Sequence, residues 1–509
     1  MLNLPIELVN KTCSYLEQPE WAALRLSCRS LYAKSLDAFA DRYFKSICFI
    51  ATSEGIRQLE ELTNNETIRV RVRHLWMIPT VFEGHHGWSL DDFYFSPYRG
   101  PMSYLRASRL RDSRLSENDD VLVARYATYQ AIKADNLALL ESNTFGSRLH
   151  ACFASFRNLE SVGLKHYATD FLLDIRQTEV RCLGLQELKN QVQYVSHRST
   201  FDRLRRHQVA KVNSLALSRM IQGLNKSNPK ITKLSTCGAN CCGSTSPILP
   251  LTREQYDSLL PKLEDLEKLH ICICYTEDDL NCTPNSITYI DLLISVAPRL
   301  KRLVFSQWYR GPRDLEARYF SELSQSISFT RLKELHLHWI QIRLESFKSF
   351  LNTTKGTMVS LSLDLVTLQP SALPSTDYGP TCWRLLWDFL QAEMSLKRCY
   401  MGQLGYQRRK VMIQGPDELA ELTYTATYNA DVNGICFKDW IGQLKPIVSE
   451  ELDLPVRRYP GLQSTKPPKA TEPFPNTHCQ NYLLCLDGAH LLHTFEYASD
   501  PSDPSDPAD

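Results

Sequence analysis

Among the reactive residue types of this 509-residue chain, the cysteines come nearest to a known motif, that of a metal site. The densest thiol cluster consists of Cys237, Cys241, Cys242, Cys272, Cys274 and Cys282. A structural zinc site needs two hooks, each with about two to four residues between its cysteines. Cys237 and Cys241 fit one hook, but a single residue separates the next candidate pair. We therefore predict no metal and no cofactor, and expect reduced cysteines that mostly pack as small apolar residues.

Motifs for nucleophilic, phosphate-transfer and metal-hydrolase chemistry are missing from the sequence. It contains no glycine-rich phosphate loop, no Gly-x-Ser-x-Gly elbow and no His-Glu-x-x-His helix. His336 and His338 alternate along a predicted strand, so both could meet a ligand or metal on one face. Contact with solvent or with a protein partner is the favoured interpretation of these two imidazoles. The sequence predicts a protein that is not an enzyme.

Three basic clusters could bind phosphate groups: RVRVRH (69–74), RLRRH (203–207) and QRRK (407–410). Valine alternates with arginine in the first, a pattern typical of a half-buried strand. The chain has 58 Lys and Arg against 57 Asp and Glu, for a formal net charge of +1. A protein that coats nucleic acid or an anionic membrane needs a larger positive excess. We expect no nucleic acid and no membrane partner, and assign the clusters to solvated faces or to an acidic protein segment.

A recurring strand pattern supplies the elements that would position polar side chains. The pattern apolar-x-x-apolar-x-apolar begins at Val72, Leu159, Val180, Val212, Ile231, Leu266, Leu300, Leu332, Met358 and Leu396. Starts from Leu159 onward lie 19 to 38 residues apart, around the roughly 20–29 of leucine-rich repeats. Amphipathic helical stretches separate the later strands. We predict an α/β fold in which residues 68–404 form an irregular leucine-rich-repeat solenoid, with parallel strands inside and helices outside.

The residues that alternate with the strand anchors are expected to line the open, concave side of the solenoid. They form a candidate substrate-binding surface of Lys268, His270, Arg302, Glu334, His336, His338, Asp364, Arg398 and Tyr400.

The segments around the clear repeats are expected to differ from them. Residues 83–150 show no clear repeat, although 119–145 should form one long helix. Residues 405–454 are expected to cap the array with a strand at 410–413 and a final helix. Residues 455–509 should comprise a proline-rich linker, a short apolar segment at 481–497 and a disordered acidic tail.

The first 49 residues have a different pattern, that of three short helices. In LPIELVNKTCSYL, the positions Leu8, Val9, Thr12, Cys13 and Leu16 fall on one helical face. Pro5 suits a first helical turn, and further apolar stripes follow from Trp21 and from Leu31. A helical segment this small cannot enclose all its apolar side chains, so it is expected to need a partner.

This opening segment resembles an F-box. The family pattern is matched by Leu4, Pro5, Glu7, Leu8, Tyr15, Leu16, Leu24, Cys28, Arg29 and Leu31, whereas Thr12 stands where the family usually has a bulky aliphatic residue. With the array behind it, the layout is similar to F-box proteins with irregular leucine-rich repeats of the fungal type. The resemblance implies a substrate-recognition subunit of an SCF-type ubiquitin ligase. Its F-box would dock on a Skp-type adaptor, and through it on a cullin–RING ligase, by Leu4, Pro5, Glu7, Leu8, Leu16, Leu24, Cys28, Arg29 and Leu31.

Two other functions stay open from the sequence. One is a stand-alone leucine-rich-repeat scaffold that binds proteins and whose N-terminal helices are only a cap. The other is a nucleic-acid binder that uses the basic clusters. No secretory signal and no apolar run near the ~20 residues of a membrane span is visible. A cytoplasmic or nuclear location, or both, is therefore expected, with an unknown protein as the substrate.

Overall fold

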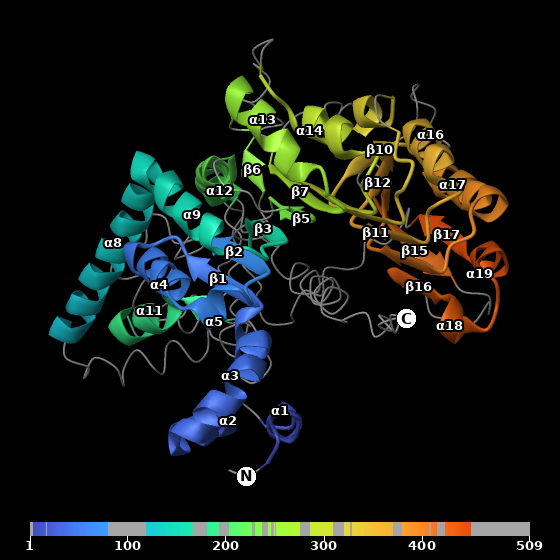
Figure 1. Cartoon of the computed structure of the whole chain (residues 1–509). Coiled ribbons are helices and arrows are strands. Elements are labelled where there is room, and N and C mark those ends of the chain that lie inside the picture. The colour runs from blue at the N-terminus through green and yellow to red at the C-terminus, as the bar shows by residue number, and fades with distance from the viewer. Residues whose placement is uncertain are drawn as a thin grey trace, which may run out of the picture. The chain divides into compact units, whose positions relative to one another are not determined.

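A computed structural model describes residues 4–16, 18–79, 119–165, 181–192, 203–225, 227, 230–236, 243–245, 249, 251–274, 286–308, 320–325, 328–369, 379–406, 409–414 and 423–448. The chain divides into two compact units. The first comprises Met1–Ile340 and Ser346–Val359, and the second comprises Gln341–Glu345 and Ser360–Asp509. The fold is mixed α/β with a large, mostly parallel sheet and many helices, compatible with an α/β solenoid (Figure 1).

Three helices open the first unit: α1 (Ile6–Ser14), α2 (Gln18–Ser27) and α3 (Arg29–Phe44). Both α1 and α2 contact α3, and α3 leads directly into the first strand (Figure 1). Glu7 lies in the first turn of α1, where a negative charge complements the helix dipole. Cys28 caps α3, because its Sγ accepts a hydrogen bond from the Leu31 backbone N at 3.5 Å. The predicted three helices are therefore present.

The sheet of the first unit is built from parallel strands that follow the chain. They are β1 (Ser46–Ile50), β2 (His74–Ile78), β3 (Ser161–Leu164), β5 (Lys233–Ser235), β7 (Lys268–Cys274), β8 (Arg302–Trp308) and β9 (Glu334–His338). Each pairs in parallel with the next in this order. The short β6 (Ser244–Thr245) pairs with β7. One anchor row of this sheet consists of the buried Ile47, Leu75, Val162, Leu234, Leu269, Leu303 and Leu335.

One strand breaks the chain order. Strand β4 (Arg181–Leu183) pairs in parallel with β1, on the side opposite β2. It therefore covers the edge that the first strand would otherwise expose, which is a common need of open sheets. The sequence pattern placed this strand between β3 and the next repeat, because a linear motif carries no information about which edge a strand joins.

Helices pack against the first sheet and against one another. They are α4 (Ser53–Thr63), α5 (Glu66–Arg69), α8 (Asp119–Glu141), α9 (Asn143–Ser155), α11 (Leu185–Val192), α12 (Arg203–Asn225), α13 (Arg253–Leu259), the 3-10 turn η3 (Leu260–Leu263), α14 (Tyr289–Val296) and α16 (Leu344–Thr354). Helix α4 contacts β1 and β4, and α12 contacts β3 and the helix α9. The long helix expected over 119–145 is present as α8, and Ser142 then caps a second helix, α9.

The second unit holds a strand pair of the same kind and a second, smaller sheet. Strand β11 (Ser360–Asp364) is parallel to β13 (Arg398–Gly402), and β16 (Thr425–Asn429) is antiparallel to β13. The smaller sheet has the order β10 (Gln341–Arg343), β12 (Thr367–Gln369), β14 (Gly405–Tyr406), β15 (Arg409–Gln414) and β17 (Lys445–Val448). Its helices are α17 (Gly379–Glu393), α18 (Ala430–Asn433) and α19 (Phe437–Gln443). The strand expected at 410–413 and the final helix are thus confirmed.

Three successive repeats share a backbone feature that the sequence pattern did not show. Directly after β9, β11 and β13 stand Trp339, Leu365 and Gln403, with φ values of 55°, 54° and 46°. A left-handed residue turns the chain sharply, and the short strands β10, β12 and β14 follow two residues later. The three parallel strands of the smaller sheet therefore arise from the same turn in each repeat, whereas β15 and β17 add to that sheet as antiparallel strands.

The strand predicted at Val212 is wrong. Residues around it lie in the middle of α12, a helix of 23 residues. Its buried positions include Val209, Asn213, Ala216 and Met220, three or four residues apart, which is the period of one helical face. The three apolar residues beginning at Val212 fit the strand motif only by coincidence, because apolar residues on one face of a helix are also spaced three residues apart.

The boundary of the N-terminal segment also needs correction. Residues 46–50 form β1, which pairs with β2, so the sheet begins inside the segment expected to be helical throughout and well before residue 68. The cluster at 69–74 does not form the expected strand: α5 ends at Arg69 and β2 begins at His74. Arg71 and Arg73 instead reach acidic partners on other segments.

Candidate protein-docking surface

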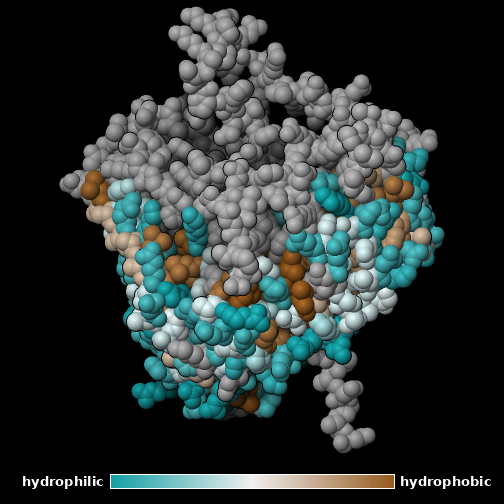
Figure 2. All heavy atoms as spheres, turned by 90° about the horizontal axis from the view of Figure 1, so that it is seen from above, coloured by the Kyte–Doolittle hydropathy of each residue, from teal (hydrophilic) through white to brown (hydrophobic). Residues whose placement is uncertain are grey.

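Exposed apolar side chains concentrate on the three N-terminal helices. Ile6, Leu8, Tyr15, Leu26 and Tyr32 are between 42% and 86% exposed, and together we call them the N-terminal docking surface. Of the other large apolar residues exposed in the described part of the chain, Val123, Ile294 and Leu385 lie on distant segments, and Tyr424, Val432 and Ile435 form a smaller group within residues 424–435. Figure 2 shows a face on which the described surface is mostly hydrophilic and apolar spots are small and separate. Single exposed apolar residues are normal, whereas a concentration of them marks an interaction site.

Helix α1 turns one apolar side inward and presents another to solvent. Val9 and Cys13 are fully buried, as the predicted helical face requires. Leu8 and Tyr15 are seven residues apart, which places both on one outward side of the helix. Burial raises the pKa of the Cys13 thiol, so this cysteine stays neutral inside the helix packing.

Two cations on α3 hold α1 by its ends. Lys34 Nζ donates a hydrogen bond to the Leu4 carbonyl oxygen at 2.9 Å. Arg42 Nη1 donates to the carbonyl oxygens of Ser14 at 3.3 Å and Leu16 at 3.4 Å. Carbonyls at a helix C-terminus lack intrahelical partners, so this contact satisfies groups that would otherwise need water. The orientation of the outward side of α1 is therefore tied to α3.

An aromatic cluster forms the small core between α2 and α3. The Trp21 ring meets Phe39 edge-on at 5.9 Å and Tyr43 at 5.5 Å. The buried guanidinium of Arg25 lies 3.8 Å from the Phe39 ring centroid and 4.4 Å from that of Tyr32. A planar cation between two rings is worth about 1–2 kcal/mol per ring when desolvated. The helices thus have a rigid interior, which lets the outer apolar side chains keep fixed positions.

The predicted adaptor-binding residues differ in their exposure to solvent. The exposed ones are Pro5, Glu7, Leu8 and Arg29. The half-buried ones are Leu4, Leu16, Leu24 and Cys28, and Leu31 is buried.

Leu31 is 7% exposed, so the expectation that it contacts a partner is not supported by its position. Its backbone N bonds to the capping Cys28, which gives both residues a role in starting α3. The predicted adaptor-binding set did not include Ile6, Tyr15, Leu26 and Tyr32. They interrupt the inward stripes at helical spacing, which is the signal that could have found them.

Helix α3 joins these helices to the sheet. Arg71, in the turn before β2, pairs with Asp37 at 3.2 Å and with Asp41 at 3.1 Å, both on α3. Tyr43 and Phe44 at the end of α3 are buried, and α3 contacts both β1 and α5. The N-terminal docking surface is therefore carried on the sheet by packed contacts.

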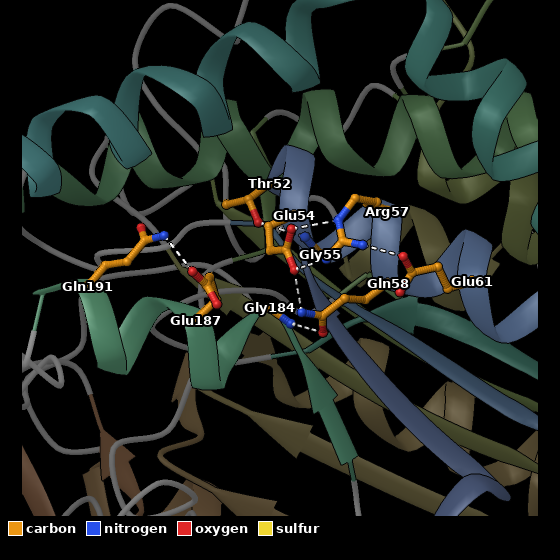
Figure 3. A network of polar contacts seen from close by, with 9 residues as sticks. All are labelled: Thr52, Glu54, Gly55, Arg57, Gln58, Glu61, Gly184, Glu187 and Gln191. Atoms are coloured by element: carbon orange, nitrogen blue, oxygen red, sulfur yellow. Dashed lines mark hydrogen bonds and ion pairs between the residues drawn. The ribbon is translucent and has the colours of Figure 1, made fainter.

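The edge of the sheet next to β1 is closed by a glycine contact and a polar network (Figure 3). The Thr52 hydroxyl accepts a hydrogen bond from the Gly55 backbone N at 3.1 Å and so caps α4. The Gly184 backbone N, just after β4, donates to Gln58 Oε1 at 2.9 Å. A Cβ on Gly184, whose φ is +81°, would lie 3.1 Å from the Gly55 Cα. Only glycine allows this approach of β4 to α4.

The predicted substrate-binding residues share one face of their strands, opposite the buried anchors. Register aligns Lys268, Arg302 and Glu334 in one row of the first unit. His270 and His336 belong to the next row and His338 to the third. Arg302 Nε lies 3.4 Å from Glu334 Oε2. In the second unit, register aligns Ser360 with Arg398 and Ser362 with Tyr400, while Asp364 lies opposite Gly402.

Two of these residues are less accessible than an open surface would require. His336 and Asp364 are buried, which contradicts the expectation that both lie open to a substrate. Lys268 is exposed, and His270, Arg302, Glu334, His338, Arg398 and Tyr400 are half-buried. Burial and the neighbouring Asp364 carboxylate raise the pKa of Tyr400 to about 12, so its phenol stays protonated at neutral pH.

The described residues offer no metal site of three or more His, Cys, Asp or Glu. Cys272 is buried on β7, with the Thr236 hydroxyl accepting a bond from its backbone N. Four members of the predicted thiol cluster, Cys237, Cys241, Cys242 and Cys282, lie outside the described residues. Within the same described segments, no helix is long and apolar enough to cross a membrane.

No family model matches the chain, and a search of curated proteins finds no match. A function must therefore be argued from the geometry described above. The first unit has two notable surfaces: exposed apolar side chains on its N-terminal helices, and a polar face on its sheet.

Proposed function

We propose that this chain is the substrate-recognition subunit of an SCF-type (cullin–RING) E3 ubiquitin ligase. The N-terminal docking surface binds a Skp-type adaptor, and the strand repeats hold a substrate protein. The chain supplies no reacting group in this role. It raises the effective concentration of the substrate near the ubiquitin-conjugating enzyme, which is a proximity effect.

The observation that carries this proposal is the gathering of exposed apolar side chains on a helical segment of F-box-like sequence. Leu8, Tyr15 and Leu26 are exposed although the same helices bury Trp21 and Val9. Burial of exposed apolar area is worth about 25 cal/mol per Å², so a partner that covers these side chains gains affinity. Tyrosine is among the residue types enriched in binding hot spots, and Tyr15 and Tyr32 are both exposed here.

The arrangement of the sheet edge disfavours the alternative in which the N-terminal helices are only a cap. A cap covers the open edge of the first strand of an array. Here β4 pairs with that edge of β1, and the Gly55–Gly184 contact holds it there. The N-terminal helices are thus not needed for closing the sheet, and their apolar exterior stays available to another protein.

The test replaces one outward leucine and compares it with a matched leucine elsewhere. Leu8→Glu and Leu385→Glu change residues that are 49% and 42% exposed, both on helices. We expect Leu8→Glu to weaken binding to a purified Skp-type adaptor at least tenfold, about 1.4 kcal/mol, because an apolar contact is replaced by a desolvated carboxylate. Leu385→Glu should bind as the wild type does. Isothermal titration calorimetry measures both.

Leu31→Ala separates docking from folding, because Leu31 is buried inside the N-terminal helices. It should lower the thermal midpoint, whereas Leu8→Glu should not, since large-to-small changes cost stability chiefly in cores. An adaptor that does not bind the wild-type chain, or that binds Leu8→Glu equally well, would contradict the proposal and leave the stand-alone scaffold.

A further inference from the structure

The sheet face opposite the buried anchors in the first unit carries nearly one sign of charge. Strand register places His74, Lys233, Lys268 and Arg302 in a single row across β2, β5, β7 and β8, with Ser161 of β3 between the first two. We call these four residues the basic row. Among the described positions of this face on β1, β2, β3, β5, β7, β8 and β9, the one carboxylate is Glu334, which pairs with Arg302.

His74 lies at the start of the row and in the field of its cations. Its ring Nδ1 lies 3.0 Å from the Ser161 hydroxyl, at the start of the row. Burial, followed by the charges of Lys45, Lys233, Arg73 and Lys268, lowers the pKa of His74 to about 4. Four cations therefore act on one imidazole, while Glu160, the residue before Ser161, is engaged by Arg73 at 3.1 Å.

The adjacent row of the same sheet face contains an aromatic ring. Trp76 lies one row above His74 on β2, and the Lys233 ammonium sits 5.0 Å from its ring centroid. The same layer contains Ser235 and His270, whose side chains are 3.4 Å apart. Its other members are Cys48, Gly163, Val304 and His336. Cations beside hydroxyl, imidazole and indole groups can bind carboxylates by charge and by hydrogen bonds at once.

The dimensions of the row suit an extended polypeptide. From β2 to β8 there are four strand spacings, roughly 19 Å at ~4.8 Å each. An extended chain covers this length with about six residues at ~3.3 Å per residue. A short acidic stretch of a protein can therefore reach the cations Lys233, Lys268 and Arg302, while His74, which is uncharged at neutral pH, can offer a hydrogen bond.

We propose that the basic row binds an acidic segment of a partner protein, six to eight residues long and rich in Asp and Glu. Calling that partner a ubiquitination substrate rests on the function proposed above, whereas the binding itself does not. A nucleic acid fits less well, because it needs cations distributed over a wide surface.

The experiment uses the full-length chain and a fluorescein-labelled octaglutamate peptide, with binding followed by fluorescence anisotropy in 50 mM salt. Lys268→Glu reverses the charge of the exposed lysine in the row. Arg253→Glu serves as the control, because it reverses another exposed cation, on α13, which pairs with Asp257 at 3.1 Å. We expect Lys268→Glu to weaken octaglutamate binding at least tenfold, Lys268→Gln to weaken it by a smaller factor, and Arg253→Glu to change it less than twofold. Binding should also weaken when salt is raised, because exposed charges are screened.

Two results would overturn the inference. One is octaglutamate binding that is unmeasurable in the wild type or equal in Lys268→Glu and the control. The other is tighter binding of an oligothymidylate with the same number of charges, which would assign the row to nucleic acid. The adaptor titration with the same variants keeps this test apart from the proposed function. Leu8→Glu should lose the adaptor and keep octaglutamate, and Lys268→Glu should do the reverse.

Discussion

The fold lowers the pKa of His74 well below that of an ordinary histidine. Its pKa is about 4 in the folded chain, against 6.5 for an ordinary histidine, because burial and four nearby cations disfavour the imidazolium. Between these two pH values the unfolded chain binds more protons than the folded chain. The stability that this residue contributes is therefore complete above about pH 6.5 and falls as the pH drops toward 4.

Replacing His74 by glutamine should remove this dependence. We expect the wild type to lose on the order of 1–3 kcal/mol more than His74→Gln between pH 7 and pH 4, since each pKa unit corresponds to about 1.4 kcal/mol and solvent screening reduces the full value. Urea titrations at pH 7, 6, 5 and 4 measure the difference. Parallel pH profiles of the two proteins would show that burial and the nearby cations do not lower the pKa of His74.

Other single positions show why local sequence is a limited guide to accessibility. Leu8 and Val9 are neighbours in one apolar stripe, yet Leu8 is half-exposed and Val9 is fully buried. Thr12 and Cys13 repeat this contrast one turn later. Helical spacing predicted that the stripe would be apolar. The direction of α3 decided which part of it is covered.

At the scale of elements, the contact between α4 and the turn after β4 depends on two glycines. Gly184 has a φ of +81°, and a Cβ there would lie 3.1 Å from the Gly55 Cα. Gly184→Ala should lower the free energy of unfolding by about 1–3 kcal/mol, because a left-handed backbone and a close contact are both penalised. Gly356→Ala, at a site with nothing within 4 Å, should change it by less than about 0.5 kcal/mol.

Urea unfolding followed by circular dichroism compares the two alanine variants with the wild type. Equal midpoints for Gly184→Ala and Gly356→Ala would mean that β4 is not locked at the sheet edge by this contact. The proposed role of β4 as the cover of that edge would then fail as well.

Most strands were predictable because their anchors recur with a two-residue alternation inside each repeat. The anchors Leu234, Leu269, Leu303 and Leu335 all lie in strands and are all buried. The element around Val212 was not predictable from the same rule, since a short apolar triple fits helix and strand equally. Only the length of the surrounding amphipathic run, which α12 extends to 23 residues, distinguishes the two.

At the scale of the molecule, the two proposed binding surfaces belong to different elements of the first unit. Amide hydrogen exchange can therefore locate both ligands in one experiment. A Skp-type adaptor should slow exchange in α1 and α2, whose apolar side chains it would cover, without changing β7 and β8. Octaglutamate should act on the strands of the basic row instead. In the free protein, α1 and α2 should exchange faster than β7 and β8, because they bury fewer apolar side chains.

Slower exchange in β7 and β8 on adaptor binding, or none in α1 and α2, would contradict the division of roles between these elements. Mass spectrometry of peptic fragments resolves the four segments separately.

The amino-acid sequence alone determined the alternation of strands and helices, the three N-terminal helices and the residues that share a strand face, because these follow from spacing within one segment. Tertiary structure decided that β4 joins β1, that Leu31 and His336 are buried, and that Tyr15 and Leu26 are not. It also aligned His74 with Lys233 and Lys268, although more than 150 residues separate the first from the second. Such contacts depend on which segments pack together, and a local pattern of apolar residues is the same for several packings.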